Sequence, residues 1–111
     1  MGYELDVTDC FGHRVRLDHV NWERHLPRHA ELAPYHGQIP LVLREPHAVV
    51  QSAADGALHF YRLGIGEGMY QPLYLHIIVD CAPTGDCWVK TCYFTGAIDV
   101  DGEVLRFQPP G

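Results

Sequence analysis

The sequence predicts an α+β fold, in which an N-terminal hairpin and helices pack on an antiparallel sheet of about four strands. Two observations carry this prediction. The hydrophobic pattern changes near Pro46 from helix-like to strand-like spacing, and Asp55-Gly56 is a strong hairpin turn signal between two strand-like runs. A length of 111 residues with 47% hydrophobic content suits one domain spanning residues 1–111.

The sequence pattern of the N-terminal part predicts a hairpin followed by a short helix. Residues 3–7 and 14–17 alternate polar and apolar side chains around a turn at 9–12. Asp18 is placed to cap a helix that begins near His19, with Trp22 in the core. Pro27 ends or kinks this helix, because an interior proline clashes with the preceding turn.

The remaining elements follow from the same reasoning. A second helix is expected over about residues 34–44, weakened by Gly37 and Pro40 and stopped by Pro46. The rest of the chain predicts strands separated by turns, over residues 47–53, 57–63, 73–80, 87–95 and 103–107.

Charge and composition exclude several classes of protein. Eight Lys and Arg residues stand against fourteen Asp and Glu residues, a net charge of −6, which gives no general footprint for a long nucleic-acid backbone. The negative net charge counts less against a small site for one or two phosphates, because binding there depends on a local cluster of cations and not on the total charge. The sequence contains no apolar run of membrane-spanning length and does not start like a signal peptide, so we expect a cytoplasmic chain that does not bind membranes.

The cysteines give a weak signal for metal. Their spacing lacks the paired two-residue gaps of zinc ribbons, so free buried thiols are the expectation and no metal or other cofactor is predicted. Cys87 and Cys92 differ by five positions, which in a regular strand puts them on opposite faces.

The segment of residues 22–32 is the most informative part of the chain for chemistry. It contains His25 and His29 four positions apart, beside Arg24 and Arg28, which could hold an anion. Histidine exchanges protons near neutral pH, so the segment indicates an acid–base site. The other six histidines are interpreted as structural or surface residues.

The order of motifs along the chain resembles the phage-borne members of the barnase–EndoU–colicin–RelE-like (BECR) nuclease superfamily. The resemblance covers about residues 9–107 and rests on the order of these landmarks: Phe11-Gly12-His13-Arg14-Val15, Leu17, Trp22 with His25 three residues on, His29 with Glu31-Leu32, Pro46 before a strand, Phe60-Tyr61-Arg62, the hydrophobic strand Leu75 to Val79, and the segment Val89 to Thr95. The family usually places a proline directly after the second histidine, whereas this chain has Ala30 there and Pro27 earlier.

The resemblance implies a metal-independent ribonuclease, of toxin or phage origin, with RNA as its partner. Under this hypothesis His25 is the general base and His29 is its acid–base partner. Arg62 and Tyr93 stabilise the charge on the scissile phosphate. Thr91 and Thr95 share a strand face with Tyr93 and would bind substrate, and Glu31 would orient a histidine or an arginine. A cognate inhibitor or immunity protein is a further expected partner.

Two other readings compete with the nuclease. A helical zinc pair of His25 and His29 with Glu31 is the weaker, because Pro27 interrupts the helix and the glutamate is out of position. The stronger alternative is a non-catalytic interaction module, whose acidic surface would bind a basic partner and whose histidines would be incidental.

Overall fold

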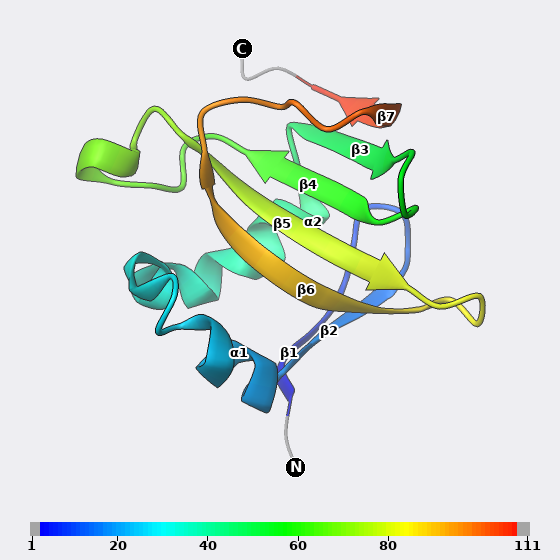
Figure 1. Cartoon of the computed structure of the whole chain (residues 1–111), viewed down its shortest axis with the longest axis horizontal. Helices are drawn as coiled ribbons and strands as arrows, with labels where there is room; N and C mark the ends of the chain where they lie inside the picture. Colours follow the sequence, from blue (N-terminus) through cyan, green and yellow to red (C-terminus); the bar gives the residue numbers. More distant parts are fainter. Residues whose placement is uncertain (1–2, 109–111) are drawn as a thin grey trace.

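The structure, a computed structural model, describes residues 3–108 and contains one seven-stranded sheet with short helices beside it (Figure 1). The strands lie in the order β1-β2-β6-β5-β4-β3-β7, so β1 and β7 form the two edges. The elements in chain order are β1 (Tyr3–Thr8), β2 (Arg14–Asp18), α1 (His19–His25), the 3-10 helix η1 (Ala30–Gln38), α2 (Ile39–Arg44), β3 (Ala48–Ser52), β4 (Leu58–Arg62), the 3-10 turn η2 (Gly68–Tyr70), β5 (Tyr74–Cys81), β6 (Asp86–Thr95) and β7 (Gly102–Phe107).

The predicted fold class is wrong. The sheet is mixed and has seven strands, because the N-terminal hairpin joins it instead of packing beside a four-stranded sheet. The joining contact is parallel: Arg14, Val15 and Arg16 of β2 pair with the start of β6. The two α-helices are short, and much of the predicted helical half is the 3-10 helix η1.

Helix α1 begins and ends where its sequence dictates. The Asp18 carboxylate accepts hydrogen bonds from the backbone N–H groups of Val20 and Asn21, at 2.8 and 3.3 Å, which satisfies donors that a helix start leaves free. The helix ends at His25, two residues before Pro27, and Trp22 is buried as predicted. The helix is thus short, and His29 lies outside it.

The predicted helix over residues 34–44 is divided in the structure. Its first part belongs to η1, which contains Pro34, and only Ile39–Arg44 is α-helical, with Pro40 in its first turn. Proline is tolerated there because the first N–H groups of a helix have no partner within the helix. Ile39, Val42 and Leu43 are buried against the sheet.

The β3–β4 hairpin forms as the Asp55-Gly56 signal predicts. The Asp55 carboxylate accepts from Ala57 N–H at 3.0 Å, and Gly56 donates to the Ser52 carbonyl at 2.8 Å. Gly56 has φ +76°, a left-handed conformation that glycine adopts without strain.

A β-bulge in β6 changes which side chains share a face. The β5–β6 register pairs Val79 with Val89 but Ile78 with Thr91, so Lys90 is an extra residue. Val89 and Cys92, three positions apart, are therefore both buried in the core beside the helices. The expectation that Cys87 and Cys92 lie on opposite faces is wrong for this reason, since both belong to that core.

The sheet buries apolar side chains on both faces. The larger core lies on the helix side and includes Trp22, Val42, Phe60 and Ile77. On the opposite face Tyr61 packs with Ala48 and Val50, and the segment between β6 and β7 contributes Ile98 and Val100. That segment passes over the sheet from the end of β6 to β7 (Figure 1).

His76 lies on the face of the sheet opposite the helices. Its side chain is only 2% exposed, so it does not border an open cleft. Its ring stacks on Tyr61 with centroids 4.2 Å apart and meets Tyr93 edge-on at 4.7 Å. His59 Nδ1 and His76 Nε2 are 2.8 Å apart, so the N–H of one ring donates a hydrogen bond to the bare nitrogen of the other. Burial lowers the pKa of His76 to about 3, which keeps this ring neutral.

Two cysteines form a disulfide, contrary to the expectation of free thiols. Cys81 and Cys87 lie directly opposite each other on β5 and β6 and are bonded. Cys10 and Cys92 are free.

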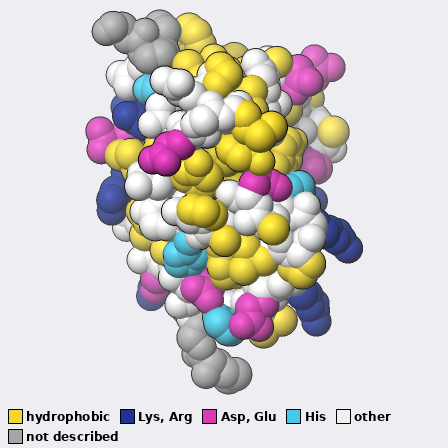
Figure 2. All heavy atoms as spheres, turned by 90° about the vertical axis from the view of Figure 1, so that its left-hand side faces the viewer, with side chains coloured by type: hydrophobic (Ala, Val, Ile, Leu, Met, Phe, Trp, Pro, Cys, Tyr) yellow, Lys and Arg dark blue, Asp and Glu magenta, His cyan; other side chains and the backbone are white. Residues whose placement is uncertain are grey.

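The surface mixes polar and apolar side chains. On the face shown in Figure 2, hydrophobic side chains occupy the middle, and Lys and Arg side chains stand at the margins. Within residues 3–108, no helix is long and apolar enough to cross a membrane.

Candidate functional site

The candidate site lies where α1 runs beside β6. Strand β2 pairs only with Asp86, Cys87 and Trp88 of β6, so no strand within residues 3–108 pairs with the later part of β6 on that side. Helix α1 follows β2 directly and lies along this part of β6 (Figure 1). The arrangement brings the histidine-containing segment against the strand that carries Thr91 and Tyr93.

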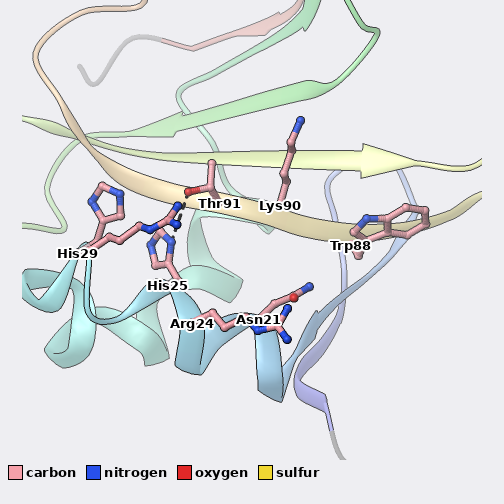
Figure 3. A pocket seen from close by; sticks show the side chains of 8 residues that line it. Asn21, Arg24, His25, His29, Trp88, Lys90 and Thr91 are labelled. Carbon is pink, nitrogen blue, oxygen red and sulfur yellow. Dashed lines mark hydrogen bonds between the residues drawn. The ribbon is translucent and has the colours of Figure 1, made fainter.

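A pocket of about 430 Å³ opens between these elements. Figure 3 shows Asn21, Arg24 and His25 rising from α1 opposite Thr91 on β6, with His29 beside His25 and Trp88 further along the strand. Its lining residues are Asn21, Arg24, His25, Arg28, His29, Trp88, Lys90 and Thr91. Three of them are cations and none is acidic, although the chain as a whole carries a net charge of −6.

His25 contacts both faces of β6. Its Nδ1 lies 3.4 Å from the Thr91 hydroxyl oxygen, and its Nε2 lies 3.6 Å from the Cys92 sulfur. Burial lowers the pKa of His25, and the neighbouring His29 lowers it further. The ring is therefore neutral at pH 7 and has a lone pair that can accept a proton.

His29 lies next to His25 despite the helix break at Pro27. The two rings stack with centroids 4.6 Å apart, and the His29 ring stacks on Tyr93 at 6.1 Å. Glu31 is 3.9 Å from His29 Nδ1 and can orient that ring. The backbone keeps His29 close to the helix end, since its N–H donates to the His25 carbonyl at 3.1 Å.

Tyr93 and Thr95 lie on the same face of β6 as Thr91, because the register pairs them with alternate residues of β5. Burial raises the pKa of Tyr93, and the charge of Asp99 raises it further, so its hydroxyl stays protonated and can donate. Thr95 lies near the end of the strand, and its hydroxyl donates to the Ala97 carbonyl at 3.4 Å. Thr91 lines the pocket. Tyr93 does not line it but stacks on His29, which does.

Arg62 is not among the residues that line the pocket. It ends β4, a strand separated from β6 by β5, and its guanidinium donates to the backbone carbonyl of Glu45. The cations that line the pocket are Arg24, Arg28 and Lys90. Sequence reasoning noted the two arginines as anion-holding groups but gave them no assigned role.

Sequence reasoning missed Lys90, Trp88 and Asn21. The bulge in β6, which no residue pattern announces, leaves Lys90 unpaired between two register positions. Trp88 is 43% exposed on a strand, and a large exposed aromatic side chain beside a cation is a signal that could have been followed. Asn21 and Arg24 lie three positions apart on α1, so they share one face of the helix.

Cys92 and His25 have the spacing of a thiol–imidazole pair, but the thiol is not available as a nucleophile. Cys92 is 2% exposed, and burial raises its pKa to about 12. A thiol with that pKa stays protonated at neutral pH, and the thiolate is the reactive form. The sulfur therefore packs against the ring of His25.

A zinc site at His25, His29 and Glu31 is not supported by the arrangement of donor atoms. Among residues 3–108, the group of potential metal ligands that lie close together consists of His13, Cys81 and Cys87, on another part of the molecule.

Comparisons of the chain with protein-family models, with curated proteins and with solved structures found no match.

Proposed function

We propose that the protein is a metal-independent ribonuclease whose active site is the pocket between α1 and β6. The observation that carries the proposal is the stacked pair of His25 and His29 among three cations, in a chain that is otherwise acidic. Cations concentrated in one pocket favour an anionic ligand, and adjacent imidazoles supply proton transfer at neutral pH.

The proposed reaction is transesterification of the RNA backbone. Neutral His25 takes the proton of a ribose 2′-hydroxyl, whose oxygen attacks the adjacent phosphorus. The bond from phosphorus to the 5′ oxygen breaks, and His29 donates a proton to that leaving oxygen. The products are a 2′,3′-cyclic phosphate and a free 5′-hydroxyl.

Charge in the transition state is met by the cations of the pocket. Arg24 and Arg28 present guanidinium groups that fit phosphate oxygens, and Lys90 adds a third positive charge from the strand. The hydroxyl groups of Thr91 and Tyr93 add donors beside the two histidines. Trp88 offers an exposed ring on which a base can stack.

The experiment is incubation of the purified chain with total RNA and with a tRNA pool, with and without chelator. We expect cleavage in both conditions, with products that carry 2′,3′-cyclic phosphate ends. Intact RNA under all conditions would contradict the proposal. Activity that chelation abolishes and a divalent ion restores would contradict the metal-independent mechanism.

A non-catalytic interaction module is the second candidate, and edge strand β7 favours it. Val104 and Phe107 of this strand are 60% and 61% exposed, so apolar side chains flank a sheet edge that no other strand of the described residues pairs with. Such edges are where other chains add strands. A folded chain that leaves RNA intact would favour this candidate.

A further inference from the structure

Three donors of the kind that zinc prefers converge at one end of the sheet, away from the proposed active site. His13 directly precedes β2, Cys81 ends β5 and Cys87 lies near the start of β6. One ligand atom from each of these residues lies within 4.8 Å of the others. None of the three lines the pocket between α1 and β6.

The strand register explains why the three side chains meet. Cys81 and Cys87 are directly opposite each other in the antiparallel β5–β6 pair, so they share a face. Val15 pairs with Cys87 across the parallel contact, and His13 lies two positions before Val15. The parallel pairing of β2 with β6, which the sequence did not predict, therefore brings His13 to the two sulfurs.

The imidazole of His13 is already held as a metal-binding histidine is held. Its Nδ1 lies 3.0 Å from the Asp9 carboxylate, which leaves Nε2 as the nitrogen available to a ligand. The Asp9 side chain is fully buried, and it also accepts hydrogen bonds from the backbone N–H groups of Phe11 and His13. A carboxylate that fixes the ring through its other nitrogen is the usual outer partner of a zinc-bound histidine.

We propose that, when the Cys81–Cys87 disulfide is reduced, the two sulfurs and His13 Nε2 bind one zinc ion, with Asp9 as the residue that positions the histidine. Zinc binds thiolate sulfur at roughly 2.3 Å and imidazole nitrogen at roughly 2.0–2.1 Å, so tetrahedral ligand atoms lie roughly 3.3–3.8 Å apart. The ligand atoms of His13, Cys81 and Cys87 already lie within 4.8 Å of one another. After reduction, small rotations of the three side chains would bring these atoms to the distances that zinc requires. Three protein ligands leave the fourth position to water.

The disulfide and the zinc site exclude each other, because both use the same sulfur atoms. A dithiol reductant supplies two electrons and two protons to the sulfur–sulfur bond, giving two thiols, and is itself converted to a disulfide. Zinc then displaces the two thiol protons as the thiolates bind it. Cys81 is exposed, which gives both the reductant and the metal access to the otherwise buried Cys87.

The test measures zinc content in the oxidised and the reduced full-length chain. The chain is reduced with a phosphine under anaerobic conditions, incubated with zinc sulfate, desalted and analysed for bound metal. We expect one zinc ion per reduced chain and none per oxidised chain. Cobalt in place of zinc should give a thiolate-to-cobalt charge-transfer band and the visible bands of a tetrahedral site.

Three variants and one control variant make the assignment specific. Cys81→Ser and His13→Ala should each lower zinc affinity at least tenfold, while Cys10→Ser, which removes a free thiol outside the group, should bind like the wild type. Asp9→Asn keeps the hydrogen-bond acceptor for the turn and should weaken binding about 10- to 100-fold. Circular dichroism checks that each variant is folded.

Equal zinc content in the oxidised and reduced chains would overturn the proposal, as would full binding by folded Cys81→Ser. A cobalt spectrum of the reduced wild type that lacks the thiolate band would overturn it without any variant. These outcomes are independent of RNA cleavage, since the assay does not involve the pocket at His25.

Discussion

The Nδ1 atom of His25 lies 3.4 Å from the Thr91 hydroxyl, and this contact joins the end of α1 to the part of β6 that β2 leaves unpaired. It fixes one ring of the histidine pair against the strand. The two chain segments that form the pocket are thus held together at the point where the proposed chemistry takes place.

Replacing His25 by alanine should remove RNA cleavage by about 10²- to 10⁴-fold, the usual contribution of a positioned general base. The matched control is His19→Ala, which changes an exposed histidine of the same helix that does not line the pocket. Cleavage rates on a defined oligonucleotide and far-ultraviolet circular dichroism check activity and folding. A folded His25→Ala variant with wild-type activity would show that His25 is structural.

The pKa of His25 should be lower than that of an ordinary histidine. Burial and the charge of His29 both lower its pKa from the ordinary value of 6.5, so its midpoint in an NMR titration should fall below 6.5. The acid limb of kcat/KM should have the same midpoint, because a base acts only above its pKa. His29→Gln removes one of the causes that lower the pKa and should move the midpoint of His25 upward. An unchanged or lower midpoint in that variant would show that the two rings are not coupled.

Replacing Arg28 by alanine should weaken substrate binding and transition-state stabilisation by about 10- to 100-fold, because a hydrogen bond to a charged group is worth about 1.5–3 kcal/mol. The matched control is Arg62→Ala, since Arg62 is engaged with the Glu45 carbonyl and does not line the pocket. Steady-state cleavage of one oligonucleotide by both variants makes the comparison. If Arg62→Ala is the more impaired and remains folded, phosphate binds elsewhere.

The buried histidines should make the protein less stable in acid. Burial lowers the pKa of His76 to about 3, whereas an unfolded chain binds this proton near pH 6.5. Between these values the unfolded state holds more protons, so the free energy of unfolding should fall by about 1.4 kcal/mol for each pH unit below 6.5. The lowered pKa of His59 adds to the effect.

Urea denaturation at several pH values between 7 and 5 measures this slope. His76→Phe keeps a ring against Tyr61 but cannot titrate, so its unfolding free energy should depend less on pH, even though the loss of the contact with His59 lowers stability at every pH. The same slope in the wild type and the variant would assign the acid sensitivity to other groups.

Local sequence signals predicted the elements well and their assembly poorly. The cap at Asp18, the burial of Trp22 and the hairpin at Asp55-Gly56 each depend on neighbouring residues, and each is confirmed. The parallel contact of β2 with β6 depends on residues most of the chain length apart, so no local pattern encodes it. The seven-stranded sheet, and with it the meeting of His13 with two cysteines, followed from that contact.

The candidate site was predicted in the same uneven way. His25, His29 and Thr91 line one pocket, and Tyr93 and Glu31 lie beside it. Arg62 does not, because β5 separates its strand from β6. Lys90 was missed because the bulge that sets its position arises from strand pairing and not from composition.

The parallel contact also sets an order of events during synthesis. His25 and His29 leave the ribosome before β6, the strand that completes their pocket, and β2 can pair with β6 only after β6 has been made. Contacts between distant segments form late and slowly, because the chain between them must first be ordered. A growing chain that has not reached β6 therefore carries the proposed catalytic side chains without the pocket in which they act, so any activity on RNA begins only once the strand has been made.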